Sequence, residues 1–466
     1  MKLLSLRLTT LKSKLYAIVF TSFIVRVVAF FLLPTKTSDF APDEGTYAYL
    51  SEWIEAGKPA NKYWVYGNLY QTARALILPA AGLVRVGVDP IHSVRMISNI
   101  YGMLSLVVIA WVLLSIQQTR QFLEINSRIS ERIILVAIVI FAFTPSHFLW
   151  SILGLREAAV EFWTMFVFAL MFNVFYLRRQ SNFSPILMLV AIPLVFSSRP
   201  QVAWVLSLTL VGYLLLQKKE RFTYILLFNL LLGTFVGYEI SRPLEFRQIE
   251  SFTATPSTTA TPSKDVLEAS KKCKYVGERI ESLGIEYKCR SELKQEVKSG
   301  IGNPVSSVID QASNIPYHHE ENKVDADSAI ATISCPISGD RPADEIFCIA
   351  WRSPYTTYTF LVRPLVGADV TSGSSFYAGV ENIFWLIALF GILVLFIRNR
   401  RLAFLSALWP SLLFMAVYCV AAGAYEGNMG TAFRHKSLIL WVVILLLAST
   451  IVATKERKSE NRGLAS

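Results

Sequence analysis

The stretch PDEGTYAYLSEWIEAGKP, residues 42–59, directly follows the first apolar segment of the chain. Pro42 suits the first position of a helix, and Asp43 and Glu44 fall in its first turn. Gly57 marks the end of the same helix. The stretch therefore predicts a short helix, joined to the end of a long apolar helix, that begins with two adjacent carboxylates.

The chain around this stretch is too apolar for a soluble protein, because 53% of its 466 residues are hydrophobic and its mean hydropathy is +0.45. A membrane-spanning helix needs about 17–25 apolar residues. Residues 185–216 suffice for two short passes, and residues 71–90 predict an interfacial or re-entrant helix. The fold class is therefore an all-α polytopic membrane protein with about ten transmembrane helices. The other apolar runs lie near 15–34, 92–116, 133–153, 157–177, 222–240, 379–397, 402–422 and 437–454.

The distribution of basic residues predicts the orientation, because Lys and Arg accumulate in short cytoplasmic loops. If the N-terminus is cytoplasmic, alternation of the helices places the short basic clusters on the same side, and both termini are inside. Residues 35–91, 242–378 and 422–436 then lie outside. The net charge of +11 is thus a signal of topology, and we expect no nucleic-acid partner. The clusters are Arg120/Arg128/Arg132, Arg178/Arg179, Lys218/Lys219/Arg221, Arg398/Arg400/Arg401 and Lys455/Arg457/Lys458.

Three regions follow from this topology. Residues 1–241 form an N-terminal transmembrane module with its first outer loop at 35–91, residues 242–378 form a large extracytoplasmic loop domain, and residues 379–466 hold the last helices and a cytoplasmic tail.

The large loop contains four of the five cysteines of the chain. An even number in an oxidising compartment predicts two disulfides that staple the loop. Three pairings are open, and we favour Cys273–Cys289 with Cys335–Cys348 because these close the shortest loops, each contributing about 3 kcal/mol. Four reduced thiols are the alternative.

Ionisable residues near the predicted outer ends of the apolar helices are the next candidates for function. Arginine side chains there suit the phosphate of a lipid carrier, since the guanidinium is planar, permanently charged and bidentate. Anchoring of the helices to lipid headgroups, or pairing of the charges with one another, is the alternative. The candidate substrate-binding residues of this kind are Arg156, Glu157, Arg199, Arg434 and His435.

Spacing alone leaves the role of Asp43 and Glu44 open. Acids in the first turn of a helix stabilise it through the helix dipole by about 0.3–1 kcal/mol. The same two carboxylates, on the side of the membrane where a lipid-linked substrate is used, also suit a general base.

The N-terminal part of the chain resembles the GT-C fold glycosyltransferases, in particular bacterial relatives of the dolichyl-phosphate-mannose protein mannosyltransferases (glycosyltransferase family 39-like). The resemblance covers about the first 115 residues, and the rest agrees only in architecture. Residues 243–375 contain no motif of that family. The shared pattern is a basic residue in the first helix, an outer Asp-Glu with a following Tyr, a closing Gly, an amphipathic stretch and an Arg before a Ser and a Gly: Arg26, Asp43, Glu44, Tyr47, Gly57, Arg95, Ser98 and Gly102.

The resemblance implies an inverting transfer of a sugar from a polyprenyl-phosphate donor to an acceptor hydroxyl on the outer face of a plasma membrane, here expected to be a bacterial inner membrane. It implies that Asp43 is the catalytic base and that Glu44 orients the acceptor or tunes Asp43. Arg199 or Arg434 would stabilise the departing phosphate. Tyr47, Arg74 and Arg95 join the candidate substrate-binding residues.

Several alternatives stay open. No cofactor is required, and a divalent metal at the Asp-Glu pair is neither indicated nor ruled out. The acceptor could be a protein, a lipid or a glycan. A polysaccharide polymerase or ligase with polyprenyl-linked donors would depend more on Arg199 and on Arg434-His435 than on Asp43. A lipid-sugar flippase would show internal repeats with interrupted helices, and we find no convincing repeat.

Overall fold

The computed structural model describes residues 11–34, 42–57, 73–118, 127–175, 177, 183–216, 221–241, 342–366, 369, 373–398, 405–425 and 429–463. In these residues the regular elements are all helices, as predicted. In chain order they are α1 Leu11–Leu32, α2 Pro42–Glu55, α4 Arg74–Arg85, α5 Pro90–Gln118, α7 Ser127–Phe143, α8 Pro145–Ile152, α9 Glu157–Phe175, α10 Phe183–Ser198, α11 Pro200–Leu216, α12 Arg221–Ser241, α17 Pro342–Val362, α18 Gly373–Arg398, α19 Leu405–Tyr425 and α20 Met429–Gly463.

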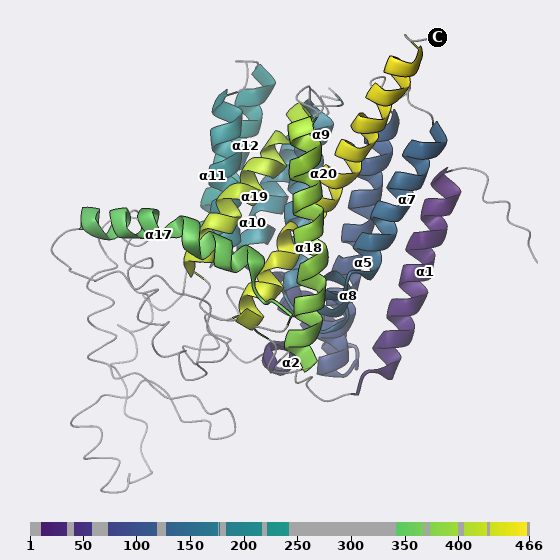
Figure 1. Cartoon of the computed structure of the whole chain (residues 1–466). Helices are drawn as coiled ribbons and strands as arrows, with labels where there is room; N and C mark the ends of the chain where they lie inside the picture. The colour runs from purple at the N-terminus through teal and green to yellow at the C-terminus, as the bar shows by residue number, and fades with distance from the viewer. Residues whose placement is uncertain are drawn as a thin grey trace, which may run out of the picture.

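The long helices run alongside one another as a bundle, with α2 at one end and the end of α20 at the other (Figure 1). We call the first of these the α2 end. Six of the described helices are long and apolar enough to cross a membrane, and α7 with α8 makes a seventh if this bent pair is one span. The protein is thus an integral membrane protein. The predicted count of ten passes requires the bent pair and three shorter apolar helices, α10, α11 and Leu408–Gly423 of α19, to cross as well.

The two short helices at the α2 end follow from local signals. The α2 helix begins at Pro42, and the chain turns after it at Gly57 with a φ of 69°, a conformation that glycine adopts without strain. The α4 helix has 12 residues, about 18 Å, too few to span a bilayer. It buries one face, including Leu76 and Ile77, and exposes Leu78. A helix that does not span was predicted within residues 71–90, and its interfacial or re-entrant placement stays a prediction.

The break between α7 and α8 is stabilised by charged side chains from two other helices. Pro145 begins α8 at a bend of 48°. Arg26 of α1 donates to the carbonyl of Ala142 near the end of α7, at 3.3 Å. Glu381 of α18 accepts from the backbone N–H of Ser146, at 2.8 Å, in the first turn of α8. Polar backbone groups at both sides of the break therefore have partners within the apolar bundle.

The apolar core consists of two clusters. The larger fills the bundle, and the smaller lies at the α2 end. The smaller cluster joins residues from α2, α4, α5, α8 and the first turns of α20, so it holds the elements around the predicted site together. Its buried members include Tyr47, Leu50, Leu76, Val94, Trp150, Leu155 and Phe433.

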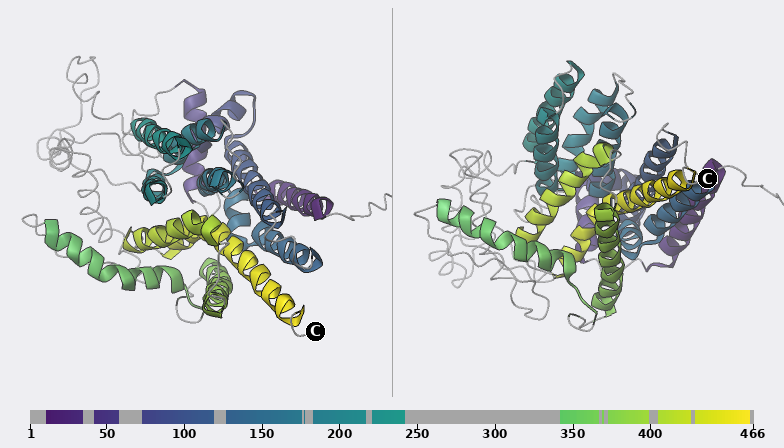
Figure 2. Two further views of the ribbon diagram at one scale, coloured as in Figure 1. Left: turned by 90° about the horizontal axis from the view of Figure 1, so that it is seen from above. Right: turned by 45° about the horizontal axis from the view of Figure 1, so that its top comes forward.

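The α17 helix lies across the direction of the bundle helices (Figures 1 and 2). Lys436 of α20 fixes its C-terminal end by donating to the carbonyls of Leu361, at 3.2 Å, and Arg363. Lys436 also donates to Asn382 of α18, at 2.9 Å. The last helices are therefore joined by a buried amine one turn or less from Arg434.

Most of the predicted loop domain at 242–378, with Cys273, Cys289 and Cys335, lies outside the described residues, as do the side-chain contacts of Cys348 in α17. The two disulfides and the three domain boundaries stay predictions. Cys419 is buried in α19 as a free thiol.

Candidate active site

Glu44 and Arg95 bind each other in the core beneath the first turn of α2. Arg95 Nε donates to Glu44 Oε1 at 2.6 Å and Nη2 to Oε2 at 2.8 Å, and both side chains are 0% exposed. The backbone N–H of Gly154 donates to the same carboxylate at 2.9 Å, and Arg95 Nη1 donates to the carbonyl of Pro34 at 2.6 Å. This bidentate pair ties α2 to α5, to the α8–α9 turn and to the end of α1.

Gly154 is required by the closeness of this packing. A Cβ added there would lie 2.5 Å from the side chain of Val94 and 3.1 Å from the backbone nitrogen of Arg95. The α8–α9 turn therefore approaches α5 closely enough for its N–H to reach Glu44.

Asp43, one residue before Glu44, faces the other way and contacts α20. Arg434 Nη1 donates to Asp43 Oδ2 at 2.8 Å, across 391 positions of sequence. The Asp43 side chain is 50% exposed and that of Arg434 is 17% exposed. The guanidinium of Arg434 also lies 5.7 Å from the ring centre of Trp150, which packs edge-on against Phe433. Asp43 is thus an accessible carboxylate next to a guanidinium that rests on an aromatic surface.

A second ion pair lies at the same end of the bundle. Glu157 starts α9, and Arg199 occupies the position between α10 and α11, where Pro200 begins the new helix. Their side chains are nearly buried, and Arg199 Nη1 lies 3.3 Å from Glu157 Oε1. The Glu157 carboxylate interacts electrostatically with Arg156, Arg199, Arg434 and His435. The two ion pairs therefore belong to one charged cluster, which we call the arginine cluster: Asp43, Arg156, Glu157, Arg199, Arg434 and His435.

Tyr47 lies one turn after Asp43 on α2 and is 1% exposed. Burial raises the pKa of its hydroxyl far above the ordinary value, so the group stays protonated. Tyr47 also interacts electrostatically with Arg156, Asp43, Glu157 and Arg199. Tyr47 therefore adds a neutral, buried hydroxyl to the electrostatic surroundings of both ion pairs.

The remaining predicted site residues occupy the following places. Arg74 begins α4 and is partly buried. His435 is 2% exposed, and its carbonyl accepts from the hydroxyl of Tyr418 at 3.3 Å. Glu44 and Arg95 were predicted to act on substrate, and in this conformation neither side chain is accessible to one.

Sequence reasoning missed Trp150 and Lys436, which lie beside Arg434, and Glu381, which binds the first turn of α8. Trp150 lies in an apolar run, where a tryptophan is ordinarily an interfacial anchor. Lys436 directly follows Arg434-His435, and this position next to two candidate residues could have identified it as a further candidate. Glu381 lies near the start of the apolar run 379–397 and was a visible charge within it.

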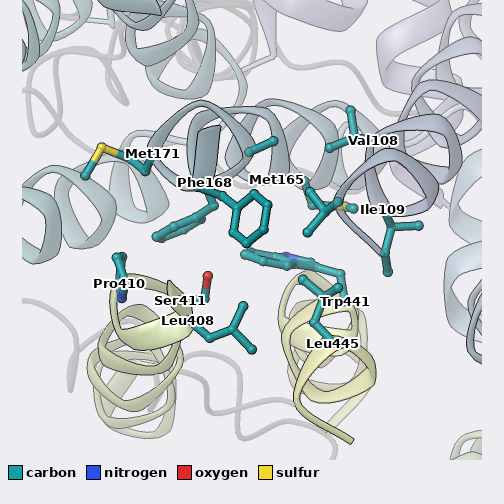
Figure 3. Close-up of a pocket in the computed structure, with 13 residues that line it drawn as sticks. Val108, Ile109, Met165, Phe168, Met171, Leu408, Pro410, Ser411, Trp441 and Leu445 are labelled. Carbon is teal, nitrogen blue, oxygen red and sulfur yellow. The ribbon is translucent and has the colours of Figure 1, made fainter. Parts of the chain in front are cut away.

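A cavity of about 20 Å³ lies among α5, α9, α19 and α20 (Figure 3). Its walls are apolar and include Phe168 and Trp441, whose ring centres lie 5.3 Å apart, and Ser411 supplies a hydroxyl. Trp441 is seven residues beyond Arg434 on α20, about 10 Å by helical rise. This cavity is therefore separate from the arginine cluster, whose Asp43 carboxylate is reached from the surface.

No group of three or more His, Cys, Asp or Glu side chains within the described ranges could hold a metal ion. In the Asp-Glu pair, Glu44 gives both oxygens to Arg95, and Asp43 binds Arg434. The two carboxylates therefore do not converge on one point in this conformation.

Neither the protein-family models nor the curated proteins contain a match to this chain. Among solved structures, it is similar to the archaeal oligosaccharyltransferase AglB from Archaeoglobus fulgidus, in complex with an inhibitory peptide and a dolichol-phosphate, at 14% identity and a TM-score of 0.39. The similarity covers 93% of this chain and 50% of AglB, so the chain spans about half the length of that protein. A TM-score of this size does not establish a common fold.

Proposed function

We propose that the protein is an inverting glycosyltransferase that moves a sugar from a polyprenyl-phosphate donor to an acceptor hydroxyl, at the membrane face away from the cytoplasm. The observation that carries the proposal is the half-exposed carboxylate of Asp43 beside Arg434, in a cluster with two further arginines. It adds to the resemblance of the first 115 or so residues to the GT-C glycosyltransferases. The acceptor class stays open.

In the proposed reaction, Asp43 takes the proton of the acceptor hydroxyl while the acceptor oxygen attacks the anomeric carbon. The bond from that carbon to the phosphate oxygen breaks on the opposite face, so the configuration inverts. The phosphate leaves with the bonding electrons, and the guanidinium groups of Arg199 and Arg434 stabilise its added charge. A positioned base supplies roughly 10²–10⁴ in rate, and orientation of both substrates supplies more.

Glu44 and Arg95 act on this reaction by holding the helix that carries the base. A fully buried bidentate pair fixes the first turn of α2, so Asp43 keeps its place beside Arg434. We therefore assign Glu44 and Arg95 as positioning residues and Asp43 as the catalytic residue.

The test is sugar transfer in membranes supplied with a polyprenyl-phosphate sugar. Asp43→Asn should abolish transfer, because the amide cannot take the proton, while abundance and thermal stability remain close to those of the unmodified protein. Glu52→Gln, which removes an exposed acid from the same helix, is the matched control and should leave transfer unchanged. Full activity of Asp43→Asn, with loss on Arg199→Gln and Arg434→Gln, would point instead to the polymerase or ligase class.

A further inference from the structure

Arg434 has two anionic partners under the proposed function: the carboxylate of Asp43 and the phosphate of the donor. Its Nη1 donates to Asp43 Oδ2 at 2.8 Å, so that oxygen is occupied by a hydrogen bond. In the proposed reaction the same guanidinium stabilises the donor phosphate. Asp43 and the donor phosphate would therefore compete for the same guanidinium.

The named members of the arginine cluster include three arginines and two carboxylates, Asp43 and Glu157. Guanidinium groups bind phosphate by charge-assisted hydrogen bonds, so a lipid phosphate is an anion of the kind that this cluster can hold. The phosphodiester of a polyprenyl-phosphate sugar carries one negative charge. The polyprenyl phosphate left after transfer carries about 1.5–2 negative charges at pH 7.

The guanidinium of Arg434 can turn from one anion to the other on a fixed support. It lies on the face of Trp150, which is 7% exposed and held by the small apolar core at the α2 end. The indole Nε1 of Trp150 is buried and has no hydrogen-bond partner in the described part of the chain. A donor thus remains available beside Arg434 for an incoming anion.

We propose that Arg434 is a shared counter-ion: it neutralises Asp43 in the free protein and moves to the donor phosphate when the donor binds. Donor binding then releases Asp43 as the base, so the donor binds before the acceptor can be deprotonated. The catalytic part of this inference rests on the proposed function, whereas the competition for Arg434 is a property of binding alone. Because coupling between two ligands of one group is reciprocal, removing the Asp43 charge must tighten phosphate binding.

The experiment measures binding of undecaprenyl phosphate to the purified full chain in lipid nanodiscs, with uncharged undecaprenol as the reference lipid. Asp43→Asn should bind undecaprenyl phosphate about fivefold or more tightly than the unmodified protein and should bind undecaprenol equally. Arg434→Gln should bind the phosphate more weakly, and Asp43→Asn combined with Arg434→Gln should be no tighter than Arg434→Gln alone. If Arg434→Gln does not fold, Arg434→Met, which also removes the charge, serves the same comparison.

The matched control is Asp89→Asn. Asp89 is an exposed acid that accepts from the backbone N–H groups of Ile91 and His92 at the start of α5, and an asparagine keeps that cap. Its variant should change the affinity by less than twofold. A gain at Asp89→Asn as large as that at Asp43→Asn, or a gain that persists without Arg434, would mean a general charge effect and overturn the proposal.

The outcomes separate this inference from the proposed function. An Asp43→Asn protein that is inactive but binds undecaprenyl phosphate no more tightly overturns the shared counter-ion and leaves the base role standing. One that transfers sugar normally yet binds the phosphate more tightly overturns the base role and supports the competition.

Discussion

Asp43 and Glu44 are adjacent in sequence and have opposite surroundings. Glu44 is fully buried in a bidentate pair with Arg95, whereas half of the Asp43 side chain is exposed beside Arg434. The difference follows from the helix, since successive residues point about 100° apart around its axis. One carboxylate therefore faces the core and stabilises the fold, and the other faces the surface and is available for chemistry.

The Glu44–Arg95 pair gives a prediction of stability. Glu44→Gln leaves a buried guanidinium without its counter-charge, so we expect a loss of about 3–5 kcal/mol in the free energy of unfolding. Glu44→Gln combined with Arg95→Met removes both charges and should recover much of the loss. Melting temperatures in detergent check this, with Glu55→Gln as the control on the same helix. Equal losses in the single and double variants would contradict the pair's assigned role.

For the arginine cluster, the sequence predicted which charged residues take part but not which of them pair with each other. Asp43 and the three outer arginines were visible as charges beside apolar runs. Their partners were not, because Asp43 and Arg434 are 391 positions apart and no local pattern relates them. The contact of Trp150 with Arg434 could not be predicted either, because a tryptophan that faces lipid at the membrane interface has the same sequence context.

Among the elements, the connection from α17 to α18 is held by an ion pair. Arg363 Nε donates to Asp369 Oδ1 at 3.0 Å, and the backbone N–H of Leu365 donates to Oδ2 at 2.8 Å. The hydrogen bond from Arg363 holds the pKa of the Asp369 carboxyl below its usual value. Lys436 of α20 binds the C-terminal end of α17. Together with this contact, the Arg363–Asp369 pair fixes the chain where it returns from the large loop to the bundle.

This ion pair predicts a pH dependence. Because the folded state lowers the pKa of Asp369, the carboxylate stabilises the fold above its unfolded pKa, about 3.9, and the contribution is lost as the pH falls through the folded pKa. Asp369→Asn should therefore cost about 1 kcal/mol near pH 6 and nothing at the acid limit. Melting temperatures measured between about pH 2 and pH 6, a range that spans the unfolded pKa and extends below it, check this. Arg363→Gln should remove the same dependence, and a constant difference at all pH values would contradict the assignment.

Elements with signals in their own residues were predictable. Pro42 and Gly57 bounded α2, and the run 185–216 divides into α10 and α11 at Pro200. The break between α7 and α8 was not predicted, since the run 133–153 was treated as one pass. The bend depends on Pro145 and also on partners from α1 and α18, which the run itself does not contain.

For the whole molecule, α2 lies at one end of the bundle and the end of α20 at the other (Figure 1). The arginine cluster includes Asp43 of α2 and so belongs to the α2 end. With the basic clusters cytoplasmic, the α2 end faces outward. This orientation is a prediction of the sequence, and it decides on which side of the membrane the proposed donor would be used.

The orientation can be tested on the full chain in a bacterial host. A fluorescent protein fused to the C-terminus should fluoresce, whereas alkaline phosphatase at the same place should be inactive, because the C-terminus is predicted to be cytoplasmic. An epitope inserted at Gly87, in the exposed turn after α4, should bind antibody on intact spheroplasts. Active phosphatase at the C-terminus, or an epitope reached only after lysis, would reverse the topology.

The junction of Glu44, Arg95 and Gly154 also restricts how this protein can change in evolution. A substitution at Glu44 or Arg95 alone leaves the other charge buried without its partner. Any side chain at Gly154 would collide with Val94. We therefore expect single substitutions in this trio to give an unstable protein, and substitutions of Asp43 to leave the chain folded. Under the proposed function, one substitution at Asp43 is enough to lose or alter the reaction, whereas the buried trio changes only by coordinated substitutions.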